Sequence, residues 1–168
     1  TKFKLPYEAE EHPEIPSIAE IKKAVNLNAK SGHGRNVFQL GELIVKSADL
    51  SLVQEAEVLL FLRKHSQVRV RTVYAVFYDE ASGEAHDMNT DYFLVMENIK
   101  GAPISSESWL SFGAETRQKI CFRMAEQLRL LRDTPAPAYY GTIHNRGWYP
   151  YFNLLSTRYQ ENCGPYDS

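Results

Sequence analysis

The order of strand-like and helix-like segments between residues 25 and 99 is the feature that most restricts the fold. Three short strand-like segments come first, a helix-like segment follows at 51–65, and two segments rich in β-branched and aromatic residues occupy 68–79 and 91–99. Regular alternation of strands and helices would favour a parallel sheet, but only one helix interrupts these five strands. The sequence therefore predicts an α+β fold, in which a five-stranded antiparallel sheet carries one packed helix and a helical region follows.

Two capping signals and one apolar stripe predict the helices. Ser17 with Glu20, and Ser51 with Gln54, fit the Ser-x-x-Glu/Gln capping box and predict helices that begin near these serines. Another helix is predicted over 111–133, where apolar residues recur at helical spacing. Its stripe consists of Ile120, Cys121, Met124, Leu128 and Leu131. A helix with such an apolar face needs a cover. We expect the aromatic-rich tail from Tyr139 to Tyr166 to provide it, or otherwise self-association or a missing C-lobe partner.

The composition argues against several kinds of partner. Of the 168 residues, 43% are hydrophobic and 24% are charged, which is typical of globular domains. The net charge of −2 gives no basic surface for nucleic acid. No apolar run reaches membrane-spanning length, and the first residues contain no signal-peptide core, so no membrane partner is expected. Cys121 and Cys163 are isolated in sequence, and we expect a cytoplasmic protein without a disulfide framework.

Two opposite charges stand in the segments that most resemble core. Alternation along 42–48 places Lys46 on the same strand face as Ile44. At about 100° per residue, Glu55 lies in the middle of the apolar stripe of 51–65, whereas Glu57 lies nearly opposite, where a solvated charge belongs. A carboxylate on a core-facing stripe is costly unless a cation meets it, and Lys46 is the nearest candidate. The alternative is that Glu55 lies at the edge of the stripe and reaches water.

The ordered series of segments resembles a known enzyme family. "ELIVKSA", "EAEVLLFLRKH", "VRVRTVYAVFYD", "YFLVMENIKGAPIS" and "AEQLRLLRD" are similar to the aminoglycoside phosphotransferase and choline kinase-like family, especially its fungal members. The resemblance runs from about residue 36 to 168 and implies a protein-kinase-like fold. It divides the chain into an extended arm (1–16), an N-lobe (17–100) with a hinge at 97–101, and a partial helical C-lobe (102–168).

The resemblance also assigns residues to the phosphate end of a nucleotide site. Lys46 matches the strand lysine that contacts the α- and β-phosphates, and Glu55 matches the helix glutamate that holds this lysine in place. "SGHG" supplies Gly32 and Gly34 where the family has a phosphate-covering loop, but a full G-x-G-x-x-G is absent. A simple hairpin turn and a degenerate phosphate loop remain equal alternatives for these glycines.

Four further residues match the adenine end of such a site. Ile44 would roof the base, and Met96 stands at the gatekeeper position. Glu97 would offer its backbone carbonyl to the adenine amino group, and Ile99 its backbone N–H to a ring nitrogen. The resemblance therefore implies ATP as the nucleotide.

The catalytic half of the family's site has no match in this chain. Phosphoryl transfer in this fold uses an Asp in a His-x-Asp loop to orient the acceptor, with an Asn and a later Asp to hold Mg²⁺. After the hinge the sequence has only Asp133 and Asp167, neither in that context. We therefore expect weak ATP binding, Mg²⁺ only in a full-length enzyme, and no activity from this chain alone. The alternatives are a non-catalytic kinase-like module, a candidate pseudoenzyme acting through partner or nucleotide binding, and a scaffold in which the Lys–Glu pair is purely structural.

Overall fold

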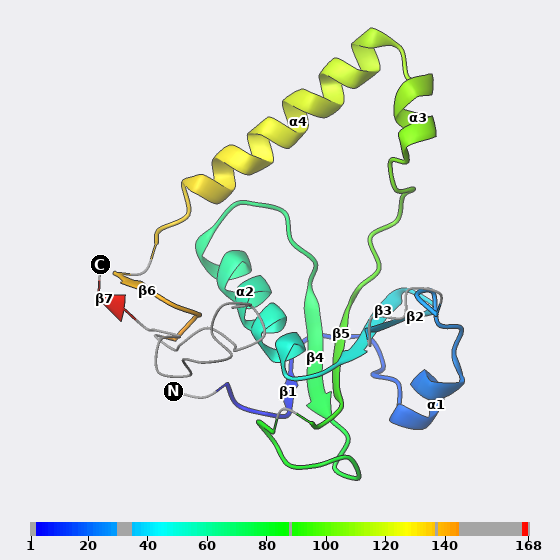
Figure 1. Ribbon diagram of the computed structural model, residues 1–168, viewed down its shortest axis with the longest axis vertical. Coiled ribbons are helices and arrows are strands. Elements are labelled where there is room, and N and C mark those ends of the chain that lie inside the picture. Colours follow the sequence, from blue (N-terminus) through cyan, green and yellow to red (C-terminus); the bar gives the residue numbers. More distant parts are fainter. Residues whose placement is uncertain (1–2, 30–34, 88, 137, 145–165, 168) are drawn as a thin grey trace, which may run out of the picture.

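The computed structural model describes residues 3–29, 35–87, 89–136, 138–144 and 166–167 (Figure 1). Its centre is a five-stranded sheet in the order β1-β4-β5-β3-β2, and all neighbouring strands are antiparallel. The strands are β1 (Tyr7–Glu8), β2 (Asn36–Leu40), β3 (Leu43–Ala48), β4 (Val73–Tyr78) and β5 (Tyr92–Glu97). The predicted α+β class and the antiparallel five-stranded sheet are confirmed.

One strand comes from a part of the chain where none was predicted. Between residues 25 and 99 the described residues form four strands, and the strand-like piece before residue 30 makes only an isolated bridge between Asn26 and Phe38. The fifth strand is β1, which belongs to the N-terminal arm and pairs with the outer edge of β4. The prediction was wrong because β1 is two residues long, too short for an alternating pattern to be visible.

Helices α1 (Ile18–Lys23) and α2 (Ser51–His65) cover opposite faces of the sheet. The core on the α2 side includes Ile44, Leu52, Val53, Ala56, Val76, Leu94 and Met96. The core on the α1 side includes Ile21, Phe38, Val45, Ala75, Phe93 and Val95. Because successive strand residues point to opposite faces, Ile44 and Lys46 of β3 both project to the α2 side. The sheet therefore places Lys46 against the helix that carries Glu55.

The two predicted capping boxes have different outcomes. At α1 the box is confirmed: the Glu20 N–H donates to Ser17 Oγ at 3.3 Å, and the Ser17 N–H donates to a Glu20 carboxylate oxygen at 2.8 Å. Helix α2 begins at Ser51 as predicted, but its box is absent. The Ser51 N–H instead donates to Asp49 Oδ1 at 2.9 Å, and Ser51 Oγ accepts from Arg35 at 3.2 Å. An Asp two residues upstream is close enough to take this first free N–H.

The chain leaves the sheet after β5 and continues into α3 (Ser106–Ser111), α4 (Ala114–Arg132), β6 (Tyr139–Tyr140) and β7 (Tyr166–Asp167). Gly101, inside the predicted hinge, has a φ of 150°, which residues with a side chain rarely adopt. Helix α4 projects away from the sheet and approaches it again only near its C-terminal end (Figure 1). Among the described helices, none combines the length and the apolar character that crossing a membrane requires.

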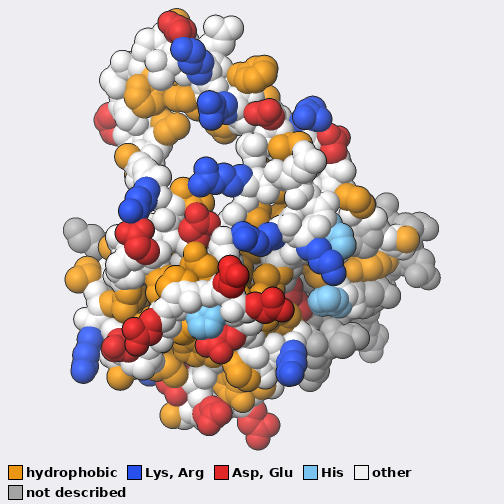
Figure 2. Space-filling view, turned by 180° about the vertical axis from the view of Figure 1, so that it is seen from behind, with side chains coloured by type: hydrophobic (Ala, Val, Ile, Leu, Met, Phe, Trp, Pro, Cys, Tyr) orange, Lys and Arg blue, Asp and Glu red, His pale blue; other side chains and the backbone are white. Residues whose placement is uncertain are grey.

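The apolar stripe predicted for α4 is present and uncovered by the described residues. Most of the tail from Tyr139 to Tyr166, the predicted cover, lies outside the described residues. Met124 is 59% exposed, Leu128 53% and Leu131 44%. Figure 2 shows hydrophobic side chains on the surface of the projecting part at the top of the molecule. An apolar face of this kind usually marks an interface.

Candidate functional site

Strand β3 and helix α2 bring Lys46 and Glu55 into contact. Lys46 Nζ donates to Glu55 Oε1 at 2.5 Å, which confirms the contact predicted from the sequence. The two side chains are 33% and 31% exposed, so the pair lies at the edge of the core and remains accessible to solvent. A charge-assisted hydrogen bond of this kind holds the ammonium group in a defined place without excluding water from it.

The neighbours of Lys46 explain how a lysine can stand in this strand. Its cross-strand partners are Val37 of β2 and Leu94 of β5, both of which belong to or pack against the α2-side core. The apolar stem of Lys46 lies between these side chains while its charged end extends toward α2. Burial of the stem and exposure of the ammonium group are therefore compatible.

The residues predicted for the adenine end lie on the neighbouring interior strands β3 and β5 and just after β5. Ile44 and Met96 are cross-strand partners, 6% and 1% exposed, and both pack in the α2-side core. Glu97 is the last residue of β5, and Ile99, which is 36% exposed, follows in the hinge. The structure thus brings Ile44, Lys46, Glu55 and Met96 onto one face, with the hinge at the end of that face.

The side chain of Glu97 makes contacts that the sequence did not indicate. Its Oε2 accepts hydrogen bonds from the Thr72 N–H at 3.2 Å and from Thr72 Oγ1 at 3.3 Å. The Thr72 hydroxyl also accepts from Arg63 Nη1 of α2 at 2.7 Å. The sequence assigned Glu97 a main-chain role only, and no spacing rule links position 97 to 72 or 63. Only the structure therefore shows that the Glu97 side chain belongs to the site.

Glu57 corrects a second expectation from the sequence. It was placed on the solvated face of α2, but it is 3% exposed. His144 Nε2 lies 4.0 Å from Glu57 Oε1, and residues Gly141–Ile143 line a cavity of about 470 Å³ together with Glu55, Glu57 and Val58. Residues 141–144, which lie far downstream in sequence, thus cover the outer face of α2. A helical wheel cannot show this because it contains no long-range information.

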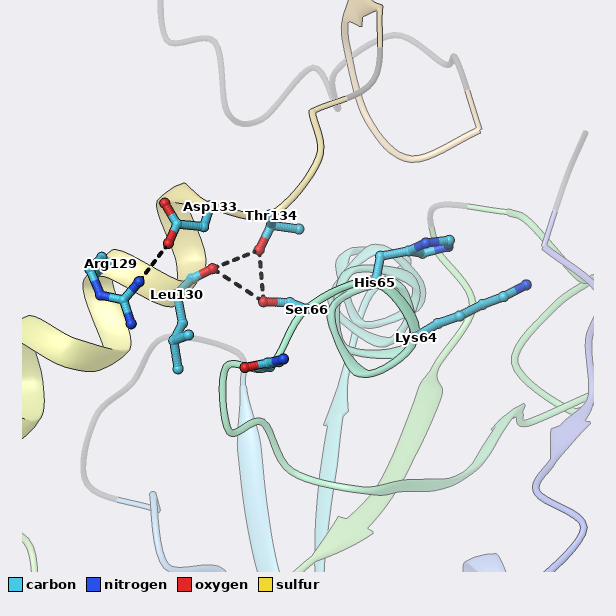
Figure 3. A pocket seen from close by; sticks show the side chains of 8 residues that line it. Lys64, His65, Ser66, Arg129, Leu130, Asp133 and Thr134 are labelled. Atoms are coloured by element: carbon cyan, nitrogen blue, oxygen red, sulfur yellow. Dashed lines mark hydrogen bonds and ion pairs between the residues drawn. The ribbon is translucent and has the colours of Figure 1, made fainter.

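A second cavity, of about 520 Å³, lies where the C-terminal ends of α2 and α4 meet (Figure 3). Thr134 Oγ1 donates to Ser66 Oγ at 2.7 Å, which ties the two ends together. Asp133 is bound by Arg129 at 2.9 Å. Lys64 and His65 point away from α4, so the charged groups around this cavity do not converge (Figure 3). The second cavity therefore marks the junction between the ends of α2 and α4.

A metal centre has little support in the part of the chain that the structure describes. There, no group of three or more His, Cys, Asp or Glu side chains is placed to hold a metal ion. Gly32 and Gly34, the candidate phosphate loop, lie outside the described residues. The described site therefore consists of a cation held by a carboxylate, an apolar strand face and the segment 97–101 that follows β5.

A comparison with protein-family models decides the family. The model described as "Phosphotransferase enzyme family" (APH) matches residues 28–165, which is more than half of the chain. The chain belongs to the phosphotransferase enzyme family. The match includes β3, α2, β5 and the hinge, so the Lys46–Glu55 pair lies within the part that carries the family pattern. No curated protein and no solved structure matches the chain.

Membership in the APH family has a general functional meaning. It indicates a kinase-like, small-molecule phosphotransferase that depends on ATP. The acceptor is not specified by membership, because one fold can host many substrates. The roles of individual residues in this chain have to be argued from its own geometry.

Proposed function

We propose that this chain is the nucleotide-binding lobe of a kinase-like small-molecule phosphotransferase. The observation that carries the proposal is the 2.5 Å contact between Lys46 and Glu55, inside a family match that covers both residues. A lysine fixed by a helix glutamate is the arrangement that kinase-like folds use to bind the α- and β-phosphates of ATP. The partial exposure of the pair leaves the ammonium group accessible to a phosphate.

The adenine would bind at the hinge end of the same sheet face. In this proposal Ile44 contacts the base from above, and Met96 limits the depth of the site. The Glu97 carbonyl accepts from the adenine amino group, and the Ile99 N–H donates to a ring nitrogen. Main-chain readout of this kind reads the edge of the base and leaves the hinge side chains free to differ.

We propose further that the residues for the chemical step are not in this chain. Bound ATP would supply the phosphoryl group, and an acceptor-orienting Asp and metal ligands would be needed beside it. Asp133 does not fit either task, because Arg129 already binds its carboxylate at the end of α4 and it is 59% exposed there. Among the described residues, none is therefore assigned to a Mg²⁺ site.

A second candidate function is a non-catalytic module that acts through a partner or through nucleotide alone. The exposed apolar face of α4 favours it, because a folded protein rarely leaves such a face in water. Either a second copy of the chain or the remainder of a C-lobe would cover this face. Both candidate functions share the nucleotide site and differ in whether phosphate is transferred.

Titration with ATP tests the shared nucleotide site. We expect weak, saturable binding, and Lys46→Ala should lower the affinity by roughly tenfold or more, because a hydrogen bond to a charged group contributes about 1.5–3 kcal/mol. Calorimetry is the measurement. Lys64→Ala is the matched control, since Lys64 is an exposed α2 lysine that points away from α4 and is outside the pair. Equal affinities for the Lys46 variant and the wild type would contradict the proposal.

Sedimentation tests the role of the α4 face. We expect the wild-type chain to associate as its concentration rises, and Leu128→Glu to shift it toward monomer because a charge is placed in the buried seam. Gln118→Glu adds the same side chain on α4 away from the stripe and should leave association unchanged. A wild-type chain that stays monomeric at every concentration would exclude self-association and leave the tail from Tyr139 to Tyr166 or a different partner to cover this face.

A further inference from the structure

The pairing of β4 with β5 ends irregularly at the hinge. Main-chain groups of alternate β5 residues face β4, and at the end of this ladder the Glu97 N–H donates to the Thr72 carbonyl at 2.9 Å. In a regular antiparallel ladder the partners exchange two bonds, so the Thr72 N–H would donate to the Glu97 carbonyl. Here the Thr72 N–H donates to Glu97 Oε2 instead, at 3.2 Å. The Glu97 carboxylate thus accepts the hydrogen bond that the Glu97 carbonyl would accept in a regular ladder.

This exchange occurs at the last residue of β5, next to the segment 97–101. On its other edge, β5 meets β3, where the Asn98 N–H donates to the Glu42 carbonyl at 3.1 Å. Since the N–H and C=O of one strand residue point to the same side, the Glu97 carbonyl faces the side of Thr72. The carboxylate thus binds the Thr72 N–H at the point where β5 ends and the chain continues into residues 97–101.

The same carboxylate also reaches α2. Thr72 Oγ1 donates to Glu97 Oε2 at 3.3 Å and accepts from Arg63 Nη1 at 2.7 Å. One hydroxyl can do both, because it has one donor and two acceptor sites. Arg63 lies about two helical turns after Glu55 on the same helix. A continuous set of hydrogen bonds therefore joins the hinge to the helix that holds Lys46.

We propose that the Glu97 side chain is a positioning residue that couples the two ends of the nucleotide site. Through Thr72 and Arg63 it holds α2 in the orientation that lets Glu55 meet Lys46. The proposal rests on the proposed nucleotide function for its ligand, while the hydrogen-bonded link itself is a property of the free chain. Binding of adenine at the hinge and ordering of the phosphate-binding lysine then favour each other.

Nucleotide affinities separate this role from a general loss of structure. Glu97→Ala should weaken ATP binding by roughly five- to tenfold, in the range of typical coupling between sites, and should weaken inorganic tripolyphosphate clearly less. Glu97→Gln keeps an acceptor oxygen for the Thr72 N–H and should restore most of the ATP affinity. Equal losses for ATP and tripolyphosphate, or no recovery with glutamine, would overturn the positioning role.

Hydrogen–deuterium exchange tests the link to α2 without any nucleotide. Glu97→Ala and Thr72→Val should both speed amide exchange in the C-terminal half of α2, whereas Glu42→Ala should not. Glu42 is the matched control because it is an exposed carboxylate beside the hinge, paired with Lys100 at 3.1 Å and 71% exposed. If the wild type binds no ATP, the proposed function fails, but faster exchange in the two variants still supports the link. Unchanged exchange in both variants would overturn it.

Discussion

Replacing Glu55 by alanine should lower the free energy of unfolding by about 1–2 kcal/mol. Removal of one partner from a fully buried ion pair costs about 3–5 kcal/mol, whereas an exposed pair contributes about 0–1 kcal/mol. Lys46 and Glu55 are each about one third exposed, so the expected value lies between these limits. Part of the loss comes from leaving the Lys46 ammonium beside apolar neighbours without its acceptor. Urea denaturation of the wild type and the variant is the measurement.

A double-mutant cycle isolates the pair itself. The combined Lys46→Met and Glu55→Ala variant should be less destabilised than the sum of the two single variants, because the second change removes the charge that the first leaves unpaired. Glu115→Ala is the matched control: Glu115 and Lys119 form an exposed pair on α4, and its loss should cost less than about 0.5 kcal/mol. A Glu55 variant as stable as the wild type would show that the pair does not constrain α2.

The sequence predicted the pair because both of its signals are local. Lys46 follows from alternation in one strand, and Glu55 follows from its angle on one helix. The strand and the helix follow each other in the sequence, and consecutive elements joined by a short connection usually pack together. The downstream segments of the family-like series then favoured the pair over a Glu55 that reaches water, and the contact is confirmed at 2.5 Å.

The wrong predictions concern features that depend on more than one local pattern. Glu57 was predicted to be solvated and is buried, because residues 141–144 cover α2 from more than 80 positions away in sequence. Strand β1 was missed because two residues carry no period, and its pairing with β4 is again long-range. The Ser51 capping box is absent, and the Ser51 N–H donates to Asp49 Oδ1 instead. Where several local arrangements are compatible with a pattern, only the packed structure chooses among them.

The Glu97 network illustrates a further limit of reading the sequence. Carried over from the family, position 97 has a main-chain role, and such a role says nothing about the side chain. Its contacts with Thr72 depend on how β4 and β5 end relative to each other, with a register irregularity between Val73 and Ala75. A bulge of this kind shifts which atoms face each other and cannot be read from propensities.

The 168-residue chain alone should transfer phosphoryl groups from ATP no faster than the uncatalysed background, even with Mg²⁺ present. Holding ATP by Lys46 and the hinge supplies binding only. The rate of such reactions comes from orienting the acceptor, which can contribute about 7–11 kcal/mol, and from stabilising the charge of the transition state. After the hinge the sequence offers Asp133 and Asp167 for these tasks, and neither stands in a His-x-Asp context.

Release of labelled phosphate, and transfer from γ-labelled ATP to small hydroxyl and amine compounds, measure this rate. The Lys46→Ala variant, purified in the same way, is the control for contaminating kinases, because a contaminant gives equal rates in both preparations. Asp133→Asn should also leave the rate unchanged, since the structure ties this carboxylate to Arg129. Metal-dependent turnover by the wild type that Lys46→Ala abolishes would contradict the prediction. It would mean that residues of this chain orient an acceptor in a way the His-x-Asp pattern does not describe, and Asp167 would then be the next carboxylate to replace.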